Sequence, residues 1–392
     1  MSPLPADFTL LQVTPELDTG GVERTTIDIA RAVTAAGGRS LVASQGGRLE
    51  PALAEAGGEL VRLPVASKNP LVVHANTRTL ERLIRAERVS LVHVRSRAPA
   101  FSALKAARRA AVPSVATYHG IYAASSPLKR WYNGVMTRGD RVIANSGFTR
   151  DHLIAAHGVD PAKVATIPRG LDLTSFDPAS VAPDRIAEMR TRWGVAADEK
   201  RPVLLLAGRL TRWKGQGLLV EALARLKARG NDRVLAVLAG DDQGRSGFRQ
   251  ELEAAIAAAG LGDQVRLVGH TADMAAAYLA ADLACAPSLA PEAFGRTAVE
   301  PQAMGRPVLA AAHGAAEETV VPGETGWLVP PGDPEAWADA IEDALAAGPG
   351  GWARMGGEGM ARARSLYSVE AMAAATLALY AELLASRASA AP

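Results

Sequence analysis

Short apolar runs alternate with amphipathic stretches through the first part of the chain. Runs with the length and character of buried strands are Phe8–Val13, Ser40–Ser44, Leu60–Pro64, Leu91–Val94, Ser114–Thr117 and Arg141–Ala144. Patterns of helical period lie between them, notably over Asn76–Arg88 and Ala98–Ala110. Strands that are apolar throughout and alternate with helices predict a parallel sheet covered by helices on both faces.

A second series of the same kind occupies the later part of the chain. Its apolar runs are Pro202–Leu206, Val234–Ala239, Val265–Val268, Leu283–Ala286, Pro307–Ala311 and Gly326–Val329. The predicted fold class is therefore α/β, with two Rossmann-like, doubly wound domains in tandem. We expect a first domain over residues 1–175, a linker over 176–200, a second domain over 201–366 and a final helix within 367–392.

Composition indicates an ordinary globular protein. Hydrophobic residues make up 48% of the chain and charged residues 21%. No apolar run approaches the ~20 residues of a membrane span, and Met1–Asp7 lacks the features of a signal peptide. Cys285, the single cysteine, lies in an apolar strand-like run and suits a buried structural thiol in a reducing compartment. We therefore expect a cytoplasmic protein.

Charge is distributed unevenly along the chain. Residues 1–180 contain 22 Lys and Arg against 15 Asp and Glu, a net charge of +7. The remaining residues contain 21 and 26, a net charge of −5. A basic first half indicates that this half meets an anionic partner.

Glycine and polar residues gather just after the predicted strands. Ligands of open α/β sheets bind beyond the carboxyl ends of the strands, so two facing sheets predict a site in the cleft between the domains. The motifs at these ends are Gly20-Gly21, Arg95-Ser96-Arg97, Tyr118-His119-Gly120, Gly208-Arg209, Gly240-Asp241, Gly269-His270 and Glu292.

Two carboxylates stand eight positions apart in the stretch Pro291–Ala312. Glu292 precedes a short helix predicted from Arg296 to Met304, and Glu300 lies inside that helix. The backbone N–H groups at the helix start favour an anion such as a phosphate, and carboxylates beside it can accept hydrogen bonds from sugar hydroxyls. The alternative is two exposed acids that flank an ordinary helix, because this spacing alone is common by chance.

Two cations follow the strand at the start of the second series. Arg209 and Lys214 lie in the sequence LLLAGRLTRWKG, which leads from the strand into a credible helix. Cations at a strand end beside a helix N-terminus suit a diphosphate. The alternative is a solvent-exposed basic turn, which explains the two cations equally well when they are considered alone.

Several other kinds of site find no support in the sequence. No G-x-G-x-x-G or phosphate loop follows a strand, which argues against a dinucleotide site. No G-x-S-x-G elbow is present, which argues against a serine hydrolase. There is neither H-E-x-x-H nor a pair of Asp residues separated by one position, so we expect no metal. We expect no nucleic-acid partner either.

Together these motifs resemble the retaining glycosyltransferases of family 4, which have the GT-B fold. The segment PEAFGRTAVEPQAMGRPV is similar to the family's E-x7-E element, Gly20-Gly21 to its GGxE loop, and Arg209 with Lys214 to its GRL…KG element. The resemblance implies that the final helix returns to pack on the first domain. It also implies a nucleotide diphosphate sugar, GDP- or UDP-linked, as co-substrate, with no cofactor.

The resemblance assigns a role to each motif. The catalytic set would be Glu292, His119, Arg209 and Lys214, with His119 against the donor sugar and the two cations on the leaving diphosphate. Glu300 would hold the ribose and Gly269-His270 the base. The full implied donor site is Gly20, Gly21, Arg209, Lys214, Gly269, His270, Glu292, Phe294, Gly295, Arg296, Thr297 and Glu300.

Segments of the first half, such as HVRSRAPAFSA and TYHGIY, look like the mannosyltransferase-like subgroup that builds lipopolysaccharide cores. Two departures from the family pattern stand out: Glu300 is followed by Pro-Gln-Ala-Met-Gly, and Arg169 replaces the usual Asn before Gly170. The first leaves the helix plausible. Because of the second, a donor contact through that Asn is not expected in this chain.

We expect the acceptor on the first domain, bound by Arg95, Arg97 and Tyr118, because paired arginines at a strand end suit an acidic sugar or phosphate. Lys105, Arg108 and Arg109 share one helical stretch, and Lys129, Arg130 and Trp131 another, a combination that suits anionic lipid headgroups. The alternative is a merely basic, solvated surface. An anionic glycolipid or glycan acceptor at the inner face of the cytoplasmic membrane, with peripheral association, is the resulting prediction.

The function expected is retaining, metal-independent transfer of a hexose of the mannose or glucose type to such an acceptor, in lipopolysaccharide core or related cell-envelope synthesis. Two alternatives remain open. A sugar-nucleotide 2-epimerase would need no acceptor, and a two-lobed sugar-binding protein would perform no chemistry.

Overall fold

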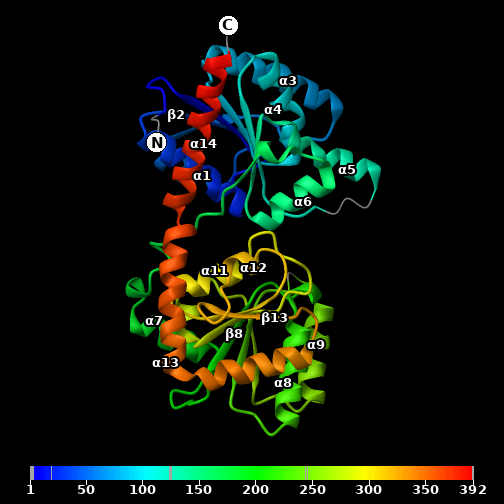
Figure 1. Ribbon diagram of the computed structural model, residues 1–392, viewed down its shortest axis with the longest axis vertical. Coiled ribbons are helices and arrows are strands. Elements are labelled where there is room, and N and C mark those ends of the chain that lie inside the picture. Colours follow the sequence, from blue (N-terminus) through cyan, green and yellow to red (C-terminus); the bar gives the residue numbers. More distant parts are fainter. Residues whose placement is uncertain (1–3, 19, 123–125, 243, 245, 391–392) are drawn as a thin grey trace. The chain divides into compact units, whose positions relative to one another are not determined.

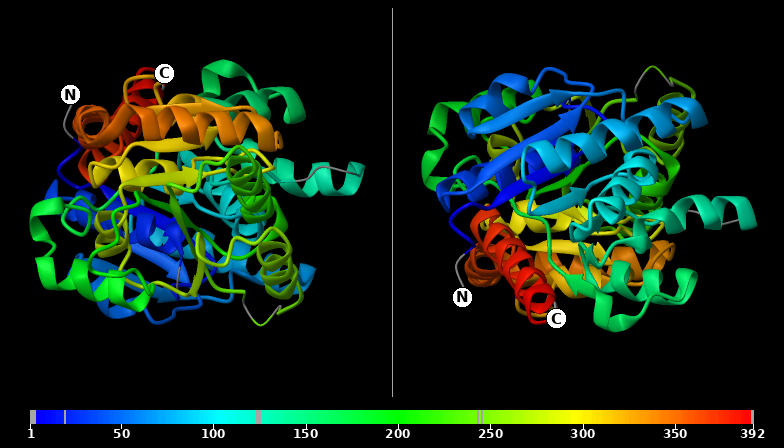
Figure 2. Two further views of the ribbon diagram at one scale, coloured as in Figure 1. Left: turned by 90° about the horizontal axis from the view of Figure 1, so that it is seen from below. Right: turned by 90° about the horizontal axis from the view of Figure 1, so that it is seen from above.

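The computed structural model describes residues 4–18, 20–122, 126–242, 244 and 246–390 of the 392. The chain divides into two compact units. Unit 1 comprises Met1–Gly170 and Val369–Pro392, and unit 2 comprises Leu171–Ser368. Each unit is a parallel sheet with helices on both of its faces (Figures 1 and 2). The predicted α/β class with two Rossmann-like domains is confirmed.

Unit 1 is built on a parallel sheet with the strand order β3-β2-β1-β4-β5-β6-β7. Every position of β1, β4 and β5 is buried, because helices cover both faces of the sheet centre. The order reverses between β1 and β4, which are adjacent but far apart in sequence. The strands are β1 (Thr9–Val13), β2 (Arg39–Ser44), β3 (Gly58–Arg62), β4 (Leu91–Val94), β5 (Ser114–Tyr118), β6 (Arg141–Ala144) and β7 (Val164–Thr166).

The helices of unit 1 begin where the sequence supplies caps. Asn69 accepts a hydrogen bond from Leu71 N at the start of α3, and Ser146 accepts one from Thr149 N at the start of α6. Gly158, at φ 63°, ends α6 in the left-handed conformation that glycine adopts readily. The helices are α1 (Gly21–Ala35), α2 (Glu50–Glu55), α3 (Pro70–Ala86), α4 (Arg97–Arg109), α5 (Pro127–Asn133), α6 (Gly147–His157) and α14 (Val369–Ala390), with the 3₁₀ turns η1 (Gly134–Arg138) and η2 (Pro161–Lys163).

The C-terminal helix α14 belongs to unit 1, where it lies beside α1 (Figure 1). Its Tyr380 is fully buried and packs on Phe8, with ring centroids 6.1 Å apart. Among the described residues, Val369–Ser389 is the one helix long and apolar enough to cross a membrane. Met372, Leu379 and Leu383 join the same buried cluster, so one face of α14 packs on the core of this unit.

Unit 2 repeats the plan with the strand order β10-β9-β8-β11-β12-β13, again parallel. Cys285 lies on β11 in its core, where burial raises the pKa of the thiol. The strands are β8 (Val203–Ala207), β9 (Leu235–Ala239), β10 (Val265–Gly269), β11 (Leu283–Ala286), β12 (Val308–Ala311) and β13 (Gly326–Val329). The helices are α7 (Pro183–Arg192), α8 (Gln216–Ala228), α9 (Ser246–Ala258), α10 (Met274–Ala280), α11 (Arg296–Ala303), α12 (Ala316–Thr319) and α13 (Pro334–Leu366), with the 3₁₀ turns η3 (Pro178–Ser180) and η4 (Arg212–Lys214).

Two parts of the chain differ from the expectation. Residues 176–200 are not a separate linker but contain α7, whose Met189 joins Trp193 and Val195 in the apolar core of unit 2. Most residues of this stretch are Pro, Ala or charged, so its composition predicts a linker although a few of its residues are buried. β7 was not expected either, because a strand of three residues carries too little pattern to be recognised.

Candidate functional site

The candidate site of unit 2 lies at the point where its strand order reverses. β8 and β11 are adjacent and parallel there, although separate series of strands continue outward from each. The segment after β8 carries Arg209 and Lys214, and the segment after β11 carries Glu292 and leads into α11. Such a switch point is where open α/β sheets bind ligands, because loops on its two sides diverge.

Glycines allow the backbone segments at this edge to approach one another closely. A Cβ on Gly240 would lie 1.8 Å from the carbonyl oxygen of Gly208, and one on Gly215 would lie 1.9 Å from that of Pro287. Gly215 also has φ 79°. The chain after β8 is therefore held against the chain after β9 and after β11 in a way that only glycine permits.

Lys214 and Glu292 form an ion pair across this edge. Lys214 Nζ donates to Glu292 Oε1 at 2.7 Å, and the same oxygen accepts a hydrogen bond from Ser288 Oγ at 2.7 Å. The lysine and glutamate side chains are only 12% and 19% exposed. Lys214 Nζ also lies 4.5 Å from the centre of the Trp213 ring. Partial burial strengthens the pairing relative to a surface ion pair.

The loop that carries Glu292 is fixed by its own backbone. Glu292 O accepts from Ala315 N at 3.0 Å, and the ring of His313 donates from Nε2 to Ser288 O at 2.8 Å. Gly295 precedes α11 in the left-handed conformation at φ 76°. The first N–H groups of α11, at Arg296 and Thr297, thus lie beside a rigidly held carboxylate, in the arrangement that favours an anion.

Glu300 is held inside α11 with both of its oxygens engaged. Oε1 accepts from Arg296 Nε at 2.7 Å, and Oε2 accepts from Tyr278 Oη at 3.0 Å. Burial raises the pKa of the Tyr278 hydroxyl, and the neighbouring Glu300 carboxylate raises it further. Glu300 is 7% exposed, whereas the Arg296 side chain is 50% exposed and can be displaced by a ligand. A diol could therefore reach Glu300 only in place of Arg296.

Other predicted donor residues have different surroundings. Arg209 is exposed, and His270 is exposed after Gly269, which has φ 72°. The Phe294 side chain is 6% exposed and packs on Tyr367, with ring centroids 5.7 Å apart. The ring of Phe294 thus belongs to the apolar core of unit 2.

Unit 1 has its own switch point between β1 and β4, and Gly20, Gly21 and His119 lie at that edge. A Cβ on Gly21 would lie 2.5 Å from Arg169 Nη1, so the guanidinium covers the start of α1. Arg169 Nη2 also donates to His119 O at 3.4 Å. Burial, together with Arg169 and Arg95, holds the pKa of His119 well below its ordinary value. Both ring nitrogens of His119 are out of contact with solvent and have no hydrogen-bond partner.

Arg95 does not face a ligand, contrary to the expectation. It is 2% exposed, donates from Nε to Gln12 Oε1 at 2.8 Å and from Nη2 to His93 Nδ1 at 3.4 Å. Burial lowers its pKa to about 10. His93 Nδ1 must accept, since arginine can only donate, and His93 Nε2 then donates to Thr117 Oγ1 at 2.6 Å. The guanidinium is thus a buried structural cation under the sheet edge.

Tyr118 is also buried, at 0% exposure, with its ring against Tyr122 at 4.9 Å. The side chain of Tyr118 lies in the apolar cluster of unit 1, so it does not present an exposed surface to an acceptor. Arg97 is half-buried at the start of α4. It donates from Nη1 to Asn133 Oδ1 at 2.7 Å, and its guanidinium lies 3.7 Å from the centre of the Tyr122 ring. The three predicted acceptor residues therefore do not form one exposed site.

Sequence reasoning missed Ser288, Tyr278 and His313. Ser288 and Tyr278 orient the two carboxylates, and His313 fixes the loop. Tyr278 lies in an alanine-rich helix and Ser288 in a loop, so neither position carried a signal. Over the described ranges, no group of three or more His, Cys, Asp or Glu side chains could hold a metal ion.

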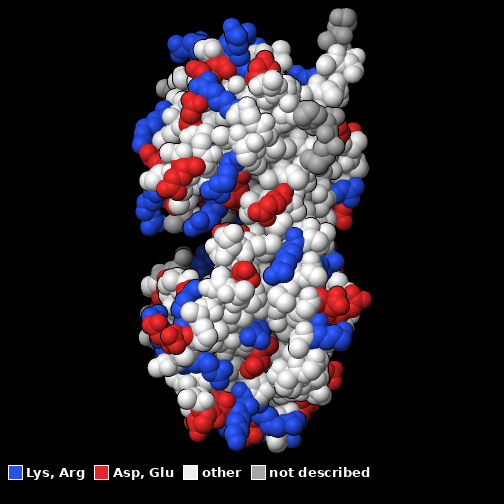
Figure 3. Space-filling view, turned by 90° about the vertical axis from the view of Figure 1, so that its left-hand side faces the viewer, with Lys and Arg blue, Asp and Glu red and all other residues white. Residues whose placement is uncertain are grey.

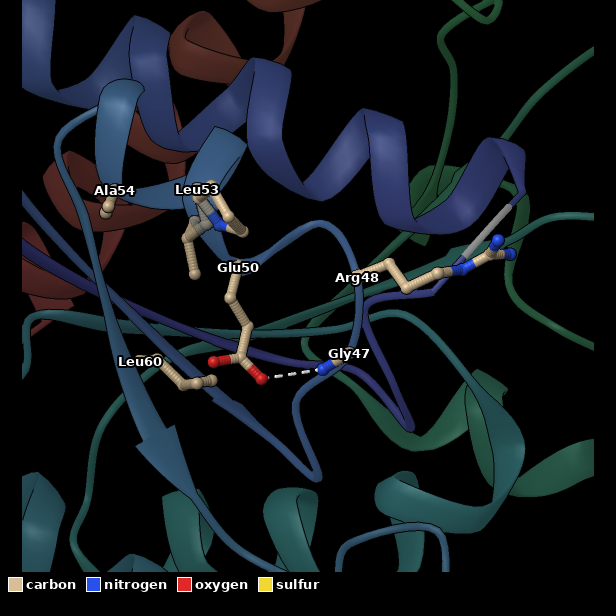
Figure 4. Close-up of a pocket in the computed structure, with 8 residues that line it drawn as sticks. Gly47, Arg48, Glu50, Leu53, Ala54 and Leu60 are labelled. Carbon is tan, nitrogen blue, oxygen red and sulfur yellow. Dashed lines mark hydrogen bonds between the residues drawn. The ribbon is translucent and has the colours of Figure 1, made fainter.

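A separate hollow of about 410 Å³ lies along α3 and α4, and another of about 610 Å³ lies between α2 and the edge strand β3. In the latter, Glu50 Oε1 accepts from Gly47 N at 2.8 Å (Figure 4). Its other oxygen accepts from Arg62 Nη2 at 2.5 Å, so the carboxylate is already satisfied. None of the predicted site residues lines this hollow.

Known proteins match both halves of the chain. The model of Glycosyltransferase Family 4 matches residues 19–175, and that of Glycosyl transferases group 1 matches residues 188–350. A crystal structure of a glycosyltransferase from Rickettsia africae is 32% identical, with a TM-score of 0.87 over 96% of this chain and 99% of that chain. Anabaena HepE in complex with UDP is 26% identical, with a TM-score of 0.79 over 97% of this chain and 100% of that chain.

Among relatives in sequence, the D-inositol 3-phosphate glycosyltransferase of Kineococcus radiotolerans is 37% identical over 270 residues, which are 65% of this chain and 60% of the relative. A relative of the same name from Geodermatophilus obscurus aligns over 47% of its length. The chain thus spans about half to three fifths of the curated relatives that it matches. With both halves matched in order and the fold shared over 96% of its length, the chain belongs to the GT-B glycosyltransferases of family 4.

Proposed function

We propose that this chain transfers a hexose from a nucleotide diphosphate sugar to an anionic acceptor, with retention of configuration and without a metal ion. The observation that carries the proposal is the Lys214–Glu292 ion pair beside the start of α11. Together these groups suit a sugar diphosphate. The cation and the N–H groups at the start of the helix would bind the phosphates, and the carboxylate would accept hydrogen bonds from the sugar hydroxyls.

The donor class draws support from the comparisons. Anabaena HepE was crystallised with UDP and with UDP-glucose, at 26% and 27% identity to this chain. Arg209 is exposed in the segment after β8 that also carries Lys214, so both cations lie on the same side of the sheet switch point. We therefore propose a UDP- or GDP-linked glucose or mannose as donor.

The chemistry that we propose breaks the bond between the sugar C1 and the β-phosphate oxygen. An acceptor hydroxyl oxygen forms the new bond to C1 on the same face, and its proton passes to the leaving phosphate oxygen. Lys214, Arg209 and the N–H groups of α11 stabilise the negative charge that grows on the diphosphate. Glu292 orients the sugar hydroxyls, and Glu300 receives the ribose once Arg296 has moved aside.

The acceptor class follows from charge. Unit 1 carries Arg169 over the start of α1, and the first half of the chain has a net charge of +7. The Kineococcus relative is named for D-inositol 3-phosphate, which is an anionic polyol. We propose a phosphorylated polyol or an anionic glycolipid as acceptor, with cell-envelope or lipopolysaccharide-core synthesis at the cytoplasmic membrane face as its setting.

A transfer assay tests the proposal. UDP-glucose, GDP-mannose and GDP-glucose are each incubated with D-inositol 3-phosphate or with an anionic glycolipid, and the anomeric configuration of the product is read by NMR. We expect an α-linked product from an α-linked donor. An inverted product would contradict the retaining mechanism. Conversion of the nucleotide sugar without any acceptor would instead identify an epimerase.

A further inference from the structure

The most exposed large apolar side chains among the described residues gather on one part of unit 1. Leu71 at the start of α3 is 80% exposed, and Leu128 and Trp131 on α5 are 73% and 54% exposed. Leu128 and Trp131 are three positions apart, so they project from the same side of a short helix. Three large side chains held in water need an explanation when they lie on neighbouring elements.

These side chains adjoin the hollow of about 410 Å³ along α3 and α4. Phe101 lines the hollow, and its ring centroid lies 5.2 Å from that of Trp131. Arg138 also lines it, and its guanidinium lies 5.6 Å from the centre of the Trp131 ring. Pro70, next to Leu71, forms part of the same wall. The apolar side chains and the hollow are therefore one continuous surface, here called the α3–α5 surface.

The charge of this surface is of one sign. Lys105, Arg108 and Arg138 line the hollow and no acidic residue does. Over the part of the chain that the structure describes, none of these three cations takes part in an ion pair. By contrast, Lys and Arg alternate with Asp and Glu on the face of the molecule shown in Figure 3. The positive charge here is unneutralised, which indicates an anionic partner.

We propose that the α3–α5 surface docks on a bilayer that contains anionic lipids. Leu71, Leu128 and Trp131 would enter the interfacial layer, where tryptophan and leucine are favoured beside lysine and arginine. Lys105, Arg108 and Arg138 would then meet lipid phosphates, one of which the hollow can accept. A soluble anion would use the cations but would leave the three apolar side chains in water, so the apolar rim favours a membrane. The inference concerns unit 1 alone and does not depend on the proposed transfer reaction.

The full chain is tested by flotation with vesicles of phosphatidylcholine, alone or with phosphatidylglycerol. We expect binding to the mixed vesicles only, weakening as salt rises. The variant Lys105→Glu/Arg108→Glu should lose at least about twentyfold in partitioning, since each cation near the surface accounts for about fivefold. The matched variant Arg48→Glu/Lys200→Glu makes the same charge change at exposed positions elsewhere and should bind within about threefold of the parent.

A second pair of variants tests the apolar rim. Leu71→Ser should lower partitioning several-fold, whereas Leu366→Ser, at another exposed leucine, should not. Melting temperatures confirm that the variants fold. Equal binding to both vesicle types, equal losses in the paired variants, or absence of binding would overturn the proposal. Glycerol phosphate binding that depends on Lys105 and Arg108, without vesicle binding, would also overturn it and would identify a soluble anion as the ligand.

Discussion

Lys214 Nζ and Glu292 Oε1 lie 2.7 Å apart, although 78 positions separate the two residues in the chain. Lys214 follows β8 and Glu292 follows β11, and these strands are neighbours where the sheet order of unit 2 reverses. The pair places opposite charges at the start of α11 before any ligand arrives. A diphosphate can compete for the lysine while the carboxylate remains held by Ser288, so the pair is suited to exchange partners on binding.

Replacement of Lys214 should weaken nucleotide binding. In Lys214→Met the stem is retained but the cation is lost, so we expect the Kd for UDP or GDP to rise by about 10- to 100-fold, or roughly 1.4–2.8 kcal/mol. Lys214→Arg should recover part of the affinity. Calorimetry measures both constants. An unchanged Kd in Lys214→Met would rule out the role of this lysine at the diphosphate.

Replacement of Glu300 should affect the donor rather than the chemical step. Glu300→Gln loses the ion pair with Arg296 and weakens any contact with a ribose diol, so we expect the donor KM to rise about tenfold with a small change in kcat. Tyr278→Phe leaves the carboxylate in place but removes one of its two partners, and should give a smaller effect in the same direction. A fall in kcat with an unchanged KM would contradict ribose binding by Glu300.

Removal of divalent ions should leave transfer intact. The proposal assigns the stabilisation of the leaving diphosphate to Lys214, Arg209 and the N–H groups of α11. Initial rates are compared before and after dialysis against excess chelator, with Mg²⁺ or Mn²⁺ added back to a parallel sample. Loss of activity that a divalent ion restores would show that the metal-independent mechanism is wrong.

Gly215 should resist substitution far more than its neighbour Gly217. A Cβ on Gly215 would lie 1.9 Å from Pro287 O, at φ 79°, whereas a Cβ on Gly217 meets nothing within 4 Å. Gly215→Ala should therefore lower the free energy of unfolding by more than about 2 kcal/mol. Gly217→Ala, inside α8, should be neutral or stabilising by up to about 1 kcal/mol. Urea unfolding compares the two variants, and similar values would argue against this close packing.

Stability should depend on pH through His93. Burial, with Arg95 and His119 nearby, holds the pKa of His93 well below its ordinary value, so the folded chain keeps the ring neutral. The unfolded chain binds a proton below its pKa of ~6.5. Stability is therefore full above that pH and is lost as the pH falls below it, by at most about 1.4 kcal/mol per pH unit for this group.

The corresponding measurement is urea unfolding of the parent and of His93→Asn at several pH values from 7.5 to 5. The variant should be less stable throughout, because it loses the bonds to Tyr380 and Thr117. Its stability should also fall less steeply below pH 6.5. Parallel pH profiles would show that the ring of His93 is not kept neutral by the fold.

Strand positions could be predicted from the sequence because apolar runs report directly on burial in a parallel sheet. Lys214 and Glu292 could be selected as candidate site residues, since glycine and helix signals mark their surroundings. Their pairing could not be predicted, because it depends on which strands are neighbours. Ser288 and Tyr278 carry no local signal and become recognisable only when the fold brings them to the carboxylates.

The acceptor prediction failed at Arg95 for a related reason. Its place after β4 suggested an exposed strand end, but the backbone of β1 and the side chain of Gln12 enclose it. Tyr380, which contacts the same network through His93 at 2.5 Å, comes from a helix 287 positions away in the chain. The sequence around Arg95 therefore gives no sign of its burial, because a helix far away in the chain contributes to it.

The substitution Glu292→Gln tests the central claim most directly, because glutamine preserves the shape of the side chain and its bond from Ser288. The variant should bind UDP or GDP as tightly as the parent or more tightly, since Lys214 loses its competing anion. Its transfer rate should fall by about two to three decades, which corresponds to roughly 2–4 kcal/mol of lost transition-state stabilisation. Steady-state kinetics and calorimetry on the same preparation decide the matter. A transfer rate within threefold of the parent would contradict a catalytic role for Glu292.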